Sequence, residues 1–393
     1  MGEWKTSELS PDLCTIVAGS TPTTSDARYW GGENVWITPN DLSSWDGHII
    51  SDSDRKLTDL GVKRATGKLL PAYSVVISCR APVGYCAIVS VPFSTNQGCK
   101  TLICQGINET YLYYVLTQST AALERVSSGT TFLELPKKEL ARFKISFPVS
   151  DNEQSKIAEI LSTVDEAIDK TRALIEKFKN IKTGMMQDLL TNGIDKNGVI
   201  RSLKTHEYKD SPLGLIPVEW DCRRFDEVMP LQRGHDLPQY SIVQGEYPVA
   251  CSNGIIAMHS QYTAKGPCVW TGRSGTIGHV FFSEQNCWMH NTSLWVTDFC
   301  GNDEKFIYYL LSSFDIKKYL AGTGVPTLNR NDLHFQHVIL PINIEEQQRI
   351  AEMLTAADAK IHAEHDYLKK LQNLKLGLMQ DLLTNTVSVD VLL

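Results

Sequence analysis

The chain has 393 residues, a formal net charge of −7 and 42% hydrophobic residues, which is typical of a globular protein of about two domains and argues against global disorder. No apolar run reaches the roughly 18 residues that a membrane span needs, and the first residues lack the apolar segment of a signal peptide. The ten cysteines are scattered and never form Cys-x-x-Cys, so we expect reduced thiols in the cytoplasm instead of disulfides or a zinc site.

The acidic balance bears on possible partners. A net negative charge argues at first against a nucleic-acid ligand, because the phosphate backbone attracts basic surfaces. A net charge of −7 does not, however, exclude a local basic face. If DNA is bound, we therefore expect other subunits to supply much of the phosphate contact.

A long segment of the chain occurs twice. Glu153–Asn192 matches Glu346–Asn385 without a gap, and roughly half of the positions are identical where chance gives about one in fifteen. In both copies apolar residues recur three and four positions apart, which is typical of a helix that packs lengthwise on another helix. The sequence therefore predicts two long helices, at 149–193 and 342–386, that form an antiparallel coiled coil with an internal pseudo-two-fold axis.

A globular region precedes each long helix. The first contains short apolar runs bounded by proline and glycine, which predict short strands and tight turns, and a helix at Asn108–Val126. The second opens like the first, because Trp220 repeats Trp4, and we match its Arg273 to Arg80. Beyond such anchors the two regions differ, as expected if both do one job on two different targets.

The predicted fold class is therefore α+β, with two globular domains separated by two long helices. In chain order, the predicted parts are a first domain at 1–148, a long helix at 149–193, a linker at 194–214, a second domain at 215–341, a long helix at 342–386 and a tail at 387–393.

Catalytic signatures are weak. Gly61–Lys68 resembles a phosphate-binding loop, but its spacing is one residue too long and Leu69 stands where Ser or Thr must reach the metal. Asp41 with Asp54–Lys56 resembles the charged residues of a metal-dependent nuclease, yet such a set arises easily in a solvated loop and the second copy lacks it. His and Cys never take metal-ligand spacing. We expect no enzyme activity, no metal and no cofactor in this chain by itself.

The remaining candidates are polar groups in loops that suit the reading of base edges. An arginine can fork onto guanine O6 and N7, and an amide can pair with adenine. For Arg80 and Arg273 a surface salt bridge is the alternative. Arg233 and His235 lie in a turn whose glycine would let the backbone approach a phosphate, and a plain turn is the alternative. The predicted DNA-binding residues are Arg80, Asn96, Gln97, Thr130, Arg233, His235, Ser252, Asn253, Arg273, Asn291 and Thr323. The amide and hydroxyl groups among them could equally cap turns.

Several short motifs, together with the order of domains and helices, point to one family. They are Gly19–Pro22, Tyr29–Trp30, Trp36–Ile37, Thr95–Gly98, Leu231–Pro238, Tyr247–Val249, Ser252–Ile256, Glu346–Ala351, Met186–Thr191 and Met379–Thr384. In these motifs and over essentially its whole length the chain resembles the specificity subunit of a Type I restriction-modification enzyme. It departs from the family pattern in one place, because Arg233–Gly234 has no matching pair in the first domain, where Ala18–Gly19 stands.

The resemblance implies two target recognition domains held apart on an antiparallel pair of long helices, each domain reading one half of a split DNA sequence. It also implies that the helices dock two methylation subunits, which bring S-adenosylmethionine and flip an adenine out of the duplex. Restriction subunits would add translocation and cleavage driven by ATP with Mg²⁺. The implied partners are double-stranded DNA, methylation subunits and restriction or motor subunits, without a membrane, in defence against phage.

The long helices carry polar residues at positions of the seam that are otherwise apolar. Thr171 and Glu364 are expected to set the register or face a partner subunit. Lys182 and Lys375 interrupt the seam at matching positions, which indicates a solvated or partner-facing end. The predicted subunit-docking residues are Thr171, Lys182, Gln187, Asp188, Glu364, Lys375, Gln380 and Asp381.

Two other classes of protein stay open. One is a coiled-coil scaffold whose globular heads bind proteins and have no DNA role, which the acidic balance favours. The other, more distant, is a metal-dependent nuclease. Because the two globular copies differ, the DNA-reading hypothesis predicts an asymmetric two-part target and not a palindrome.

Overall fold

The computed structural model describes residues 3–80, 82–127, 133–321 and 326–389. By contacts between Cα atoms the chain divides into two compact units, Met1–Ala173 with His365–Leu393 and Leu174–Glu364. The division falls inside the two long helices and not at the predicted helix ends. Each helix therefore contributes one half to each unit.

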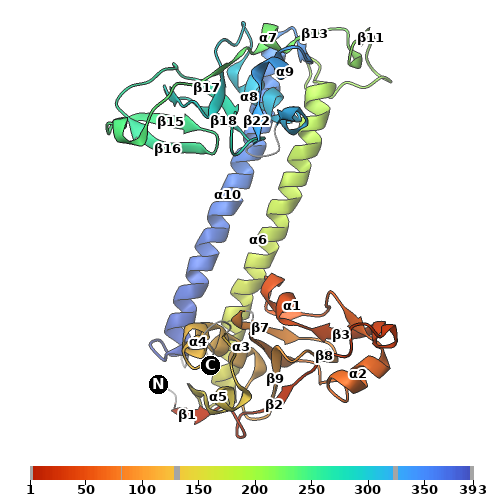
Figure 1. The fold of residues 1–393 in the computed structure, drawn as a ribbon, viewed down its shortest axis with the longest axis vertical. Coiled ribbons are helices and arrows are strands. Elements are labelled where there is room, and N and C mark those ends of the chain that lie inside the picture. Colours follow the sequence, from red (N-terminus) through yellow and green to blue (C-terminus); the bar gives the residue numbers. More distant parts are fainter. Residues whose placement is uncertain (1–2, 81, 128–132, 322–325, 390–393) are drawn as a thin grey trace. The chain divides into compact units, whose positions relative to one another are not determined.

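The two long helices are α6 (Asp151–Thr191, 41 residues) and α10 (Ile344–Leu383, 40 residues), shown in Figure 1. In the first unit the beginning of α6 and the end of α10 share one apolar core, and in the second unit the end of α6 and the beginning of α10 share another. The two helices therefore run antiparallel in both units. This confirms the predicted coiled coil and the internal repeat.

The first unit contains one large and two smaller sheets. The five-stranded sheet has the order β2-β9-β6-β7-β4, the three-stranded sheet the order β5-β3-β8, and β1 pairs with β10. The strands are β1 (Trp4–Glu8), β2 (Cys14–Ala18), β3 (Trp30–Ile37), β4 (Ile49–Ile50), β5 (Lys56–Leu57), β6 (Ser74–Cys79), β7 (Val83–Val89), β8 (Phe93–Thr95), β9 (Cys99–Cys104) and β10 (Lys144–Pro148). The helices before α6 are η1 (Ala27–Tyr29), α1 (Pro39–Ser44), α2 (Asp59–Ala65), α3 (Glu109–Gln118), α4 (Thr120–Arg125) and α5 (Lys137–Arg142).

The core of the first unit joins its sheet to α6. Every residue of the central strand β6 is buried, and helix α3 packs its apolar face on this sheet. Leu161 of α6 belongs to the same core, so the globular part is anchored on the long helix. Asn108 begins α3 as predicted, because its side chain accepts a hydrogen bond from Tyr111 N at 2.9 Å. The predicted helix is broken once, at Ser119, between α3 and α4.

The second unit repeats this plan with altered sheets. Their strand orders are β14-β20-β17-β18 and β16-β15-β19, and the pairs are β11-β12, β13-β23 and β21-β22. The strands are β11 (Tyr208–Ser211), β12 (Gly214–Pro217), β13 (Trp220–Arg224), β14 (Leu231–Arg233), β15 (Tyr247–Cys251), β16 (Gly254–His259), β17 (Cys268–Gly272), β18 (Val280–Ser283), β19 (Trp288–Met289), β20 (Ser293–Val296), β21 (Leu320–Ala321), β22 (Thr327–Leu328) and β23 (His337–Pro341). The short helices are α7 (Phe225–Val228), η2 (Gln239–Ser241), α8 (Glu304–Ser313), η3 (Ile316–Tyr319) and α9 (Arg330–His334).

The same tryptophan contact begins both long helices. Trp4 on β1 donates its indole N–H to Glu153 at 3.4 Å, and Trp220 on β13 donates to Glu346 at 3.1 Å. Each tryptophan lies opposite the proline that ends the domain, in the pairs β1-β10 and β13-β23. The repeated tryptophan therefore connects the first and last strands of each domain to the helix that follows.

A partly buried ion pair joins the two long helices once in each unit. In the first unit Lys375 Nζ lies 2.6 Å from Asp165, which also accepts a hydrogen bond from Tyr114 OH at 2.8 Å. In the second unit Lys182 Nζ lies 2.5 Å from Asp358, which accepts from a tyrosine of α8 at 2.9 Å. Lys182 and Lys375 therefore bridge α6 and α10 within the chain instead of lying free in solvent, while their contact with a partner subunit stays a prediction.

The segment between α6 and the second domain is more ordered than a plain linker. The predicted linker, 194–214, contains β11 and a buried arginine, Arg201. Arg201 forms two hydrogen bonds with Glu346, at 2.6 and 3.0 Å, and its side chain is 5% exposed. Ile194 N also donates to this carboxylate, at 3.1 Å. The segment thus ties the end of α6 to the beginning of α10.

Replacement of Arg201 by methionine should strongly destabilise the protein. The change leaves the Glu346 carboxylate buried without its cation, a loss of about 3–5 kcal/mol in the free energy of unfolding. Arg223→Met is the matched control, because Arg223 pairs with Asp221 at the surface, where such a pair contributes about 0–1 kcal/mol. Urea unfolding of both variants measures the difference, and equal small losses would contradict the expected role of Arg201.

Candidate nucleic-acid interface

A hollow in the second unit gathers several of the predicted DNA-binding residues. Its volume is about 800 Å³, and it lies where the end of β14, the end of β17 and the beginning of α9 meet. Arg233, His235 and Arg273 line it, together with Arg330, which was not among the predicted residues. The structure thus brings three predicted residues together and adds a third arginine.

One carboxylate belongs to the lining of the hollow, that of Asp236. It lies 3.7 Å from Arg233 Nη2 and accepts a hydrogen bond from the amide of Asn291. Arg273 Nη1 donates to Asn291 O at 3.5 Å, and Arg330 Nη1 donates to a carbonyl of β14 at 3.4 Å. Among the described residues, neither of these two guanidinium groups has a carboxylate within 4.0 Å. Most of their N–H groups are therefore available to an anionic or acceptor-rich ligand.

A histidine beside the hollow adds no charge to it. His334 of α9 accepts a hydrogen bond from Leu231 N at 2.9 Å through Nε2. Burial lowers the pKa of His334, and the acceptor role requires a neutral ring. His334 therefore adds no positive charge to the three arginines that line the hollow.

The glycine of the Arg-Gly-His-Asp turn has a packing reason. A Cβ atom at Gly234 would overlap the carbonyl oxygens of Met289 and His290. A Cβ atom at Gly19, in the first unit, would overlap the carbonyl of Thr95 in the same way. Glycine is therefore needed where two protein segments cross, while the approach of a phosphate to this turn stays a prediction.

Ser252 and Asn253 form the turn between β15 and β16, outside the lining of the hollow. Ser252 N donates to the hydroxyl of Thr292 at 3.3 Å, and the turn closes with Gly254 at φ +103°. Asn253 is exposed. The turn lies beside the end of β17, because a Cβ atom at Gly272 would stand 3.2 Å from the Ser252 side chain. The predicted Thr323 lies outside the described residues.

The predicted residues of the first unit lie in a turn before β9 and at the end of β6. Asn96 caps this turn, because its Oδ1 accepts from Gly98 N at 2.9 Å, which was the alternative to base contact. Gln97 is exposed, and its Oε1 accepts a hydrogen bond from Thr21 at 2.5 Å. Arg80 follows β6 and forms a single β-bridge with Glu134. Thr130 lies outside the described residues.

The contact between Thr21 and Gln97 has a counterpart in the second unit. There Asp236 and Asn291 join the same two segments, the one after β14 and the one before β20. In the first unit the contact links the segment after β2 to the turn before its neighbour β9. In the second unit it links the segment after β14 to the turn before its neighbour β20. Gln97 and Asn291 are therefore equivalent residues, which their sequence contexts did not indicate.

Arg80 and Arg273 are not equivalent residues. The N–H of Cys79 donates to the turn before β9, and the N–H of Arg273 donates to the turn before β20, each at 2.7 Å. The carbonyl of Cys79 accepts from the segment before α5, and the carbonyl of Arg273 accepts from the segment before α9, each at 2.8 Å. Arg80 matches Ser274 instead, because each forms one β-bridge, Arg80 with the segment before α5 and Ser274 with the segment before α9. The match we predicted is off by one residue, and in a strand one residue moves a side chain to the opposite face.

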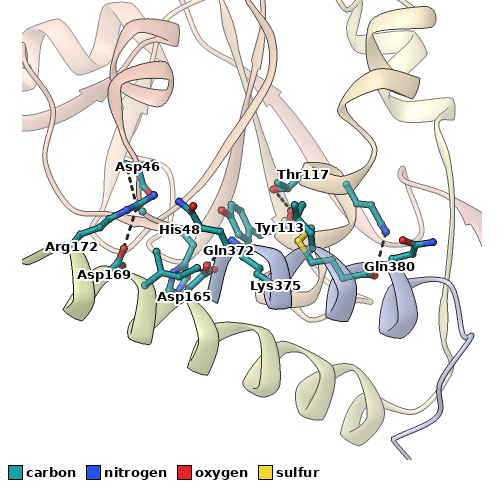
Figure 2. A pocket seen from close by; sticks show the side chains of 15 residues that line it. Asp46, His48, Tyr113, Thr117, Asp165, Asp169, Arg172, Gln372, Lys375 and Gln380 are labelled. Carbon is teal, nitrogen blue, oxygen red and sulfur yellow. Dashed lines mark hydrogen bonds and ion pairs between the residues drawn. The ribbon is translucent and has the colours of Figure 1, made fainter. Parts of the chain in front are cut away.

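A second hollow, of about 650 Å³, lies in the first unit between the 46–48 loop, α3 and the halves of α6 and α10 that belong to this unit (Figure 2). Its charged groups are already paired. Arg172 lies 2.8 Å from Asp46, and Asp165 holds Lys375 at 2.6 Å and His48 at 3.7 Å. These pairs join the loop and both helices, so the hollow belongs to the packing of the domain on its helices.

The predicted subunit-docking residues differ in exposure. Thr171 is buried and its hydroxyl donates to the carbonyl one turn earlier in α6 at 2.7 Å, so it faces the seam and not a partner. Gln187, Asp188 and Gln380 are exposed near the helix ends, while Asp381 and Glu364 are partly buried. The exposed residues stay candidates for contact with a partner.

The residues that resembled catalytic motifs have structural roles. Asp41 caps helix α1, since its carboxylate accepts from Thr38 N and from Asp54 N, each at 2.9 Å. Most of the Gly61–Lys68 stretch lies in and just after helix α2 and not in a loop. In the described part of the chain, no group of three His, Cys, Asp or Glu residues could hold a metal ion.

None of the described helices combines the length and apolarity needed to cross a membrane.

Comparison with known proteins places the whole chain beside one family. The family model described as "Type I restriction modification DNA specificity domain" matches residues 1–180 and 217–373. The Type I restriction enzyme MjaIX specificity subunit of Methanocaldococcus jannaschii is 26% identical over 376 residues, covering 86% of this chain and 83% of the relative. The EcoprrI specificity subunit of Escherichia coli is 23% identical over 357 residues, covering 86% and 84%.

Solved structures agree on the fold. The S subunit of a Type I restriction-modification system from M. genitalium superposes with a TM-score of 0.66 at 16% identity, covering 97% of this chain and 96% of that one. A chain from a study of complex assembly and conformational transition in the type I R-M system superposes with a TM-score of 0.58 at 14% identity, covering 97% of both. At these identities the likeness concerns the fold.

Proposed function

Because the chain belongs to the family of Type I restriction-modification DNA specificity domains, we propose that it reads a two-part, asymmetric DNA sequence, one part with each globular domain. One observation carries the proposal, a site that both units build and that we call the corner. It lies between the end of β6, the turn before β9 and the segment before α5 in the first unit, and between the end of β17, the turn before β20 and the segment before α9 in the second. The two corners carry different polar groups. In the second unit the corner is the arginine-lined hollow. Arginine forks suit base edges and phosphates, and different side chains in matched corners suit different bases.

We infer that the chain itself carries no catalytic centre and acts through partners. Two methylation subunits would bring S-adenosylmethionine and flip the target adenine. Restriction subunits would bring ATP with Mg²⁺ for translocation and cleavage. The complex would act in the cytoplasm, where the DNA is, and its partners would supply much of the phosphate contact that a chain of net charge −7 lacks.

Exposed apolar residues on the long helices support the docking of two copies of one partner. In the first unit Tyr367 and Leu374 of α10 are 50% and 51% exposed, one heptad apart. In the second unit Leu174 and Ile181 of α6 take the repeated positions, and Ile181 is 45% exposed. Exposed apolar residues at heptad spacing on a helix are typical of a binding face. Their duplication fits two identical methylation subunits.

Replacement of Leu374 by aspartate should remove one of the two methylation subunits from the complex. A carboxylate at the centre of an apolar contact costs about 2–4 kcal/mol of binding free energy, which is enough to lose one copy at micromolar concentration. Native mass spectrometry of the co-expressed complex measures the stoichiometry. Asn373→Asp, on an exposed neighbour, is the control. Two retained copies in the Leu374→Asp complex would rule out this docking face.

Binding to DNA tests the proposed function directly. The co-expressed chain and methylation subunit should bind a defined duplex with an affinity that falls steeply with salt, because phosphate contacts release counterions. A protein-binding scaffold would bind no duplex in a sequence-dependent way. Metal-dependent cutting of DNA by the isolated chain would instead support the nuclease alternative.

A further inference from the structure

The corner of the first unit also contains a cation, which comes from a different strand. In the second unit Arg273 Nη1 donates to the carbonyl of Asn291. The equivalent carbonyl in the first unit belongs to Gln97, and it accepts a hydrogen bond from Lys100 Nζ at 3.1 Å. A lysine and an arginine therefore bind the same backbone position in the two domains.

The strand pairing shows how the two arrangements are related. Lys100 on β9 pairs with Ile77 of β6, and Leu294 on β20 pairs with Thr271 of β17. Lys100 is therefore the counterpart of Leu294, just as Cys79 is the counterpart of Arg273. The cation that binds this carbonyl and the uncharged side chain have therefore exchanged strands between the two units.

Lys100 is a largely buried lysine whose charge has little compensation. The residue is 7% exposed, and among the described residues Gln97 O is the one acceptor within hydrogen-bond distance of its ammonium. No carboxylate of the described chain lies within 4.0 Å of it. A buried, incompletely bonded charge is unfavourable for folding. Leu294 is 2% exposed at the same strand position, so the strand does not require a lysine there.

We propose that Lys100 is the first domain's counterpart of Arg273 and donates a hydrogen bond to an acceptor atom of the DNA half-site that this domain reads. The inference rests on the proposed DNA-reading function and deepens it. An ammonium is a compact point charge and a guanidinium is a planar fork, so the two domains would address their half-sites with different chemistry. The lysine thereby contributes to an asymmetric target.

The variant Lys100→Leu in the full chain, bound to its methylation subunits, tests the proposal. We expect an affinity for the target about tenfold lower or more, with unchanged base preferences in the second half-site. If the acceptor is on a base, the methylated motif loses discrimination at one position of the first half-site. If it is a phosphate, the motif is unchanged and the slope of log affinity against log salt falls by about one.

Control variants separate this role from folding and from the loss of any one charge. Lys68→Leu removes an exposed lysine of the same domain and should leave binding unchanged. Equal urea unfolding of the compared complexes is required, and Lys100→Met replaces Lys100→Leu if the leucine variant unfolds.

Two results have different meanings. If the wild-type complex binds no duplex in a sequence-dependent way, the proposed function fails. If the wild-type complex binds but the Lys100 variants match Lys68→Leu in affinity, motif and salt slope, the role of Lys100 is refuted while the proposed function stands.

Discussion

Replacement of Arg273 by alanine should weaken or relax the recognition of one half-site and leave the other unchanged. Arg273 lines the hollow of the second unit, its guanidinium is held by a single carbonyl, and no described carboxylate neutralises it. A bidentate contact from arginine to guanine contributes about 1–3 kcal/mol of discrimination, which is about 5- to 150-fold in affinity. Affinity for duplexes changed at single positions of each half-site measures this effect.

The conservative variant Arg273→Lys separates charge from geometry. Lysine keeps the positive charge but not the fork, so a base contact should be largely lost and a phosphate contact largely kept. Arg223→Ala, a surface arginine of the same unit that pairs with Asp221, is the matched control and should have no effect on DNA. Equal loss at both half-sites in Arg273→Ala would indicate misfolding or a lost subunit contact instead of base reading.

Insertion of one heptad into both long helices should lengthen the recognised gap between the half-sites and leave both half-sites unchanged. Seven helical residues add about 10.5 Å, or about three base pairs of B-form DNA. Insertion after Ala173 in α6 and after Asp366 in α10 keeps Asp165 beside Lys375 and Asp358 beside Lys182. Methylation mapping of the variant complex gives the gap directly.

The control is insertion of the heptad into one helix alone. One lengthened helix cannot keep both ion pairs and both shared apolar cores in register, so this variant should lose binding. An unaltered gap after the double insertion would contradict the idea that helix length sets the spacing.

The two long helices and the internal repeat could be predicted from the sequence because both depend on local patterns. A seam with apolar residues three and four positions apart specifies a long helix whatever surrounds it, and the repeated Trp4 and Trp220 mark equivalent places in both copies. The ion pairs of Lys182 and Lys375 were not predicted because their aspartate partners lie on the other helix, at sequence separations that no local pattern reveals.

The site was less predictable because it depends on register between strands. The match of Arg80 to Arg273 followed a constant shift in sequence, whereas the strands of the two copies are displaced by one further residue. Lys100 gave no signal because a lysine within a strand is ordinary until its burial is known. Arg201, in a segment predicted as a linker, shows the same limit: its partner Glu346 lies far along the chain.

Mapping of methylated adenines across a genome tests the central claim most directly. The chain is expressed with a methylation subunit in cells that lack other adenine methylation, and all modified positions are read. We expect one asymmetric motif of two short parts separated by a gap of fixed length. Absence of adenine methylation that depends on this chain, or a single continuous or palindromic motif, would contradict the account.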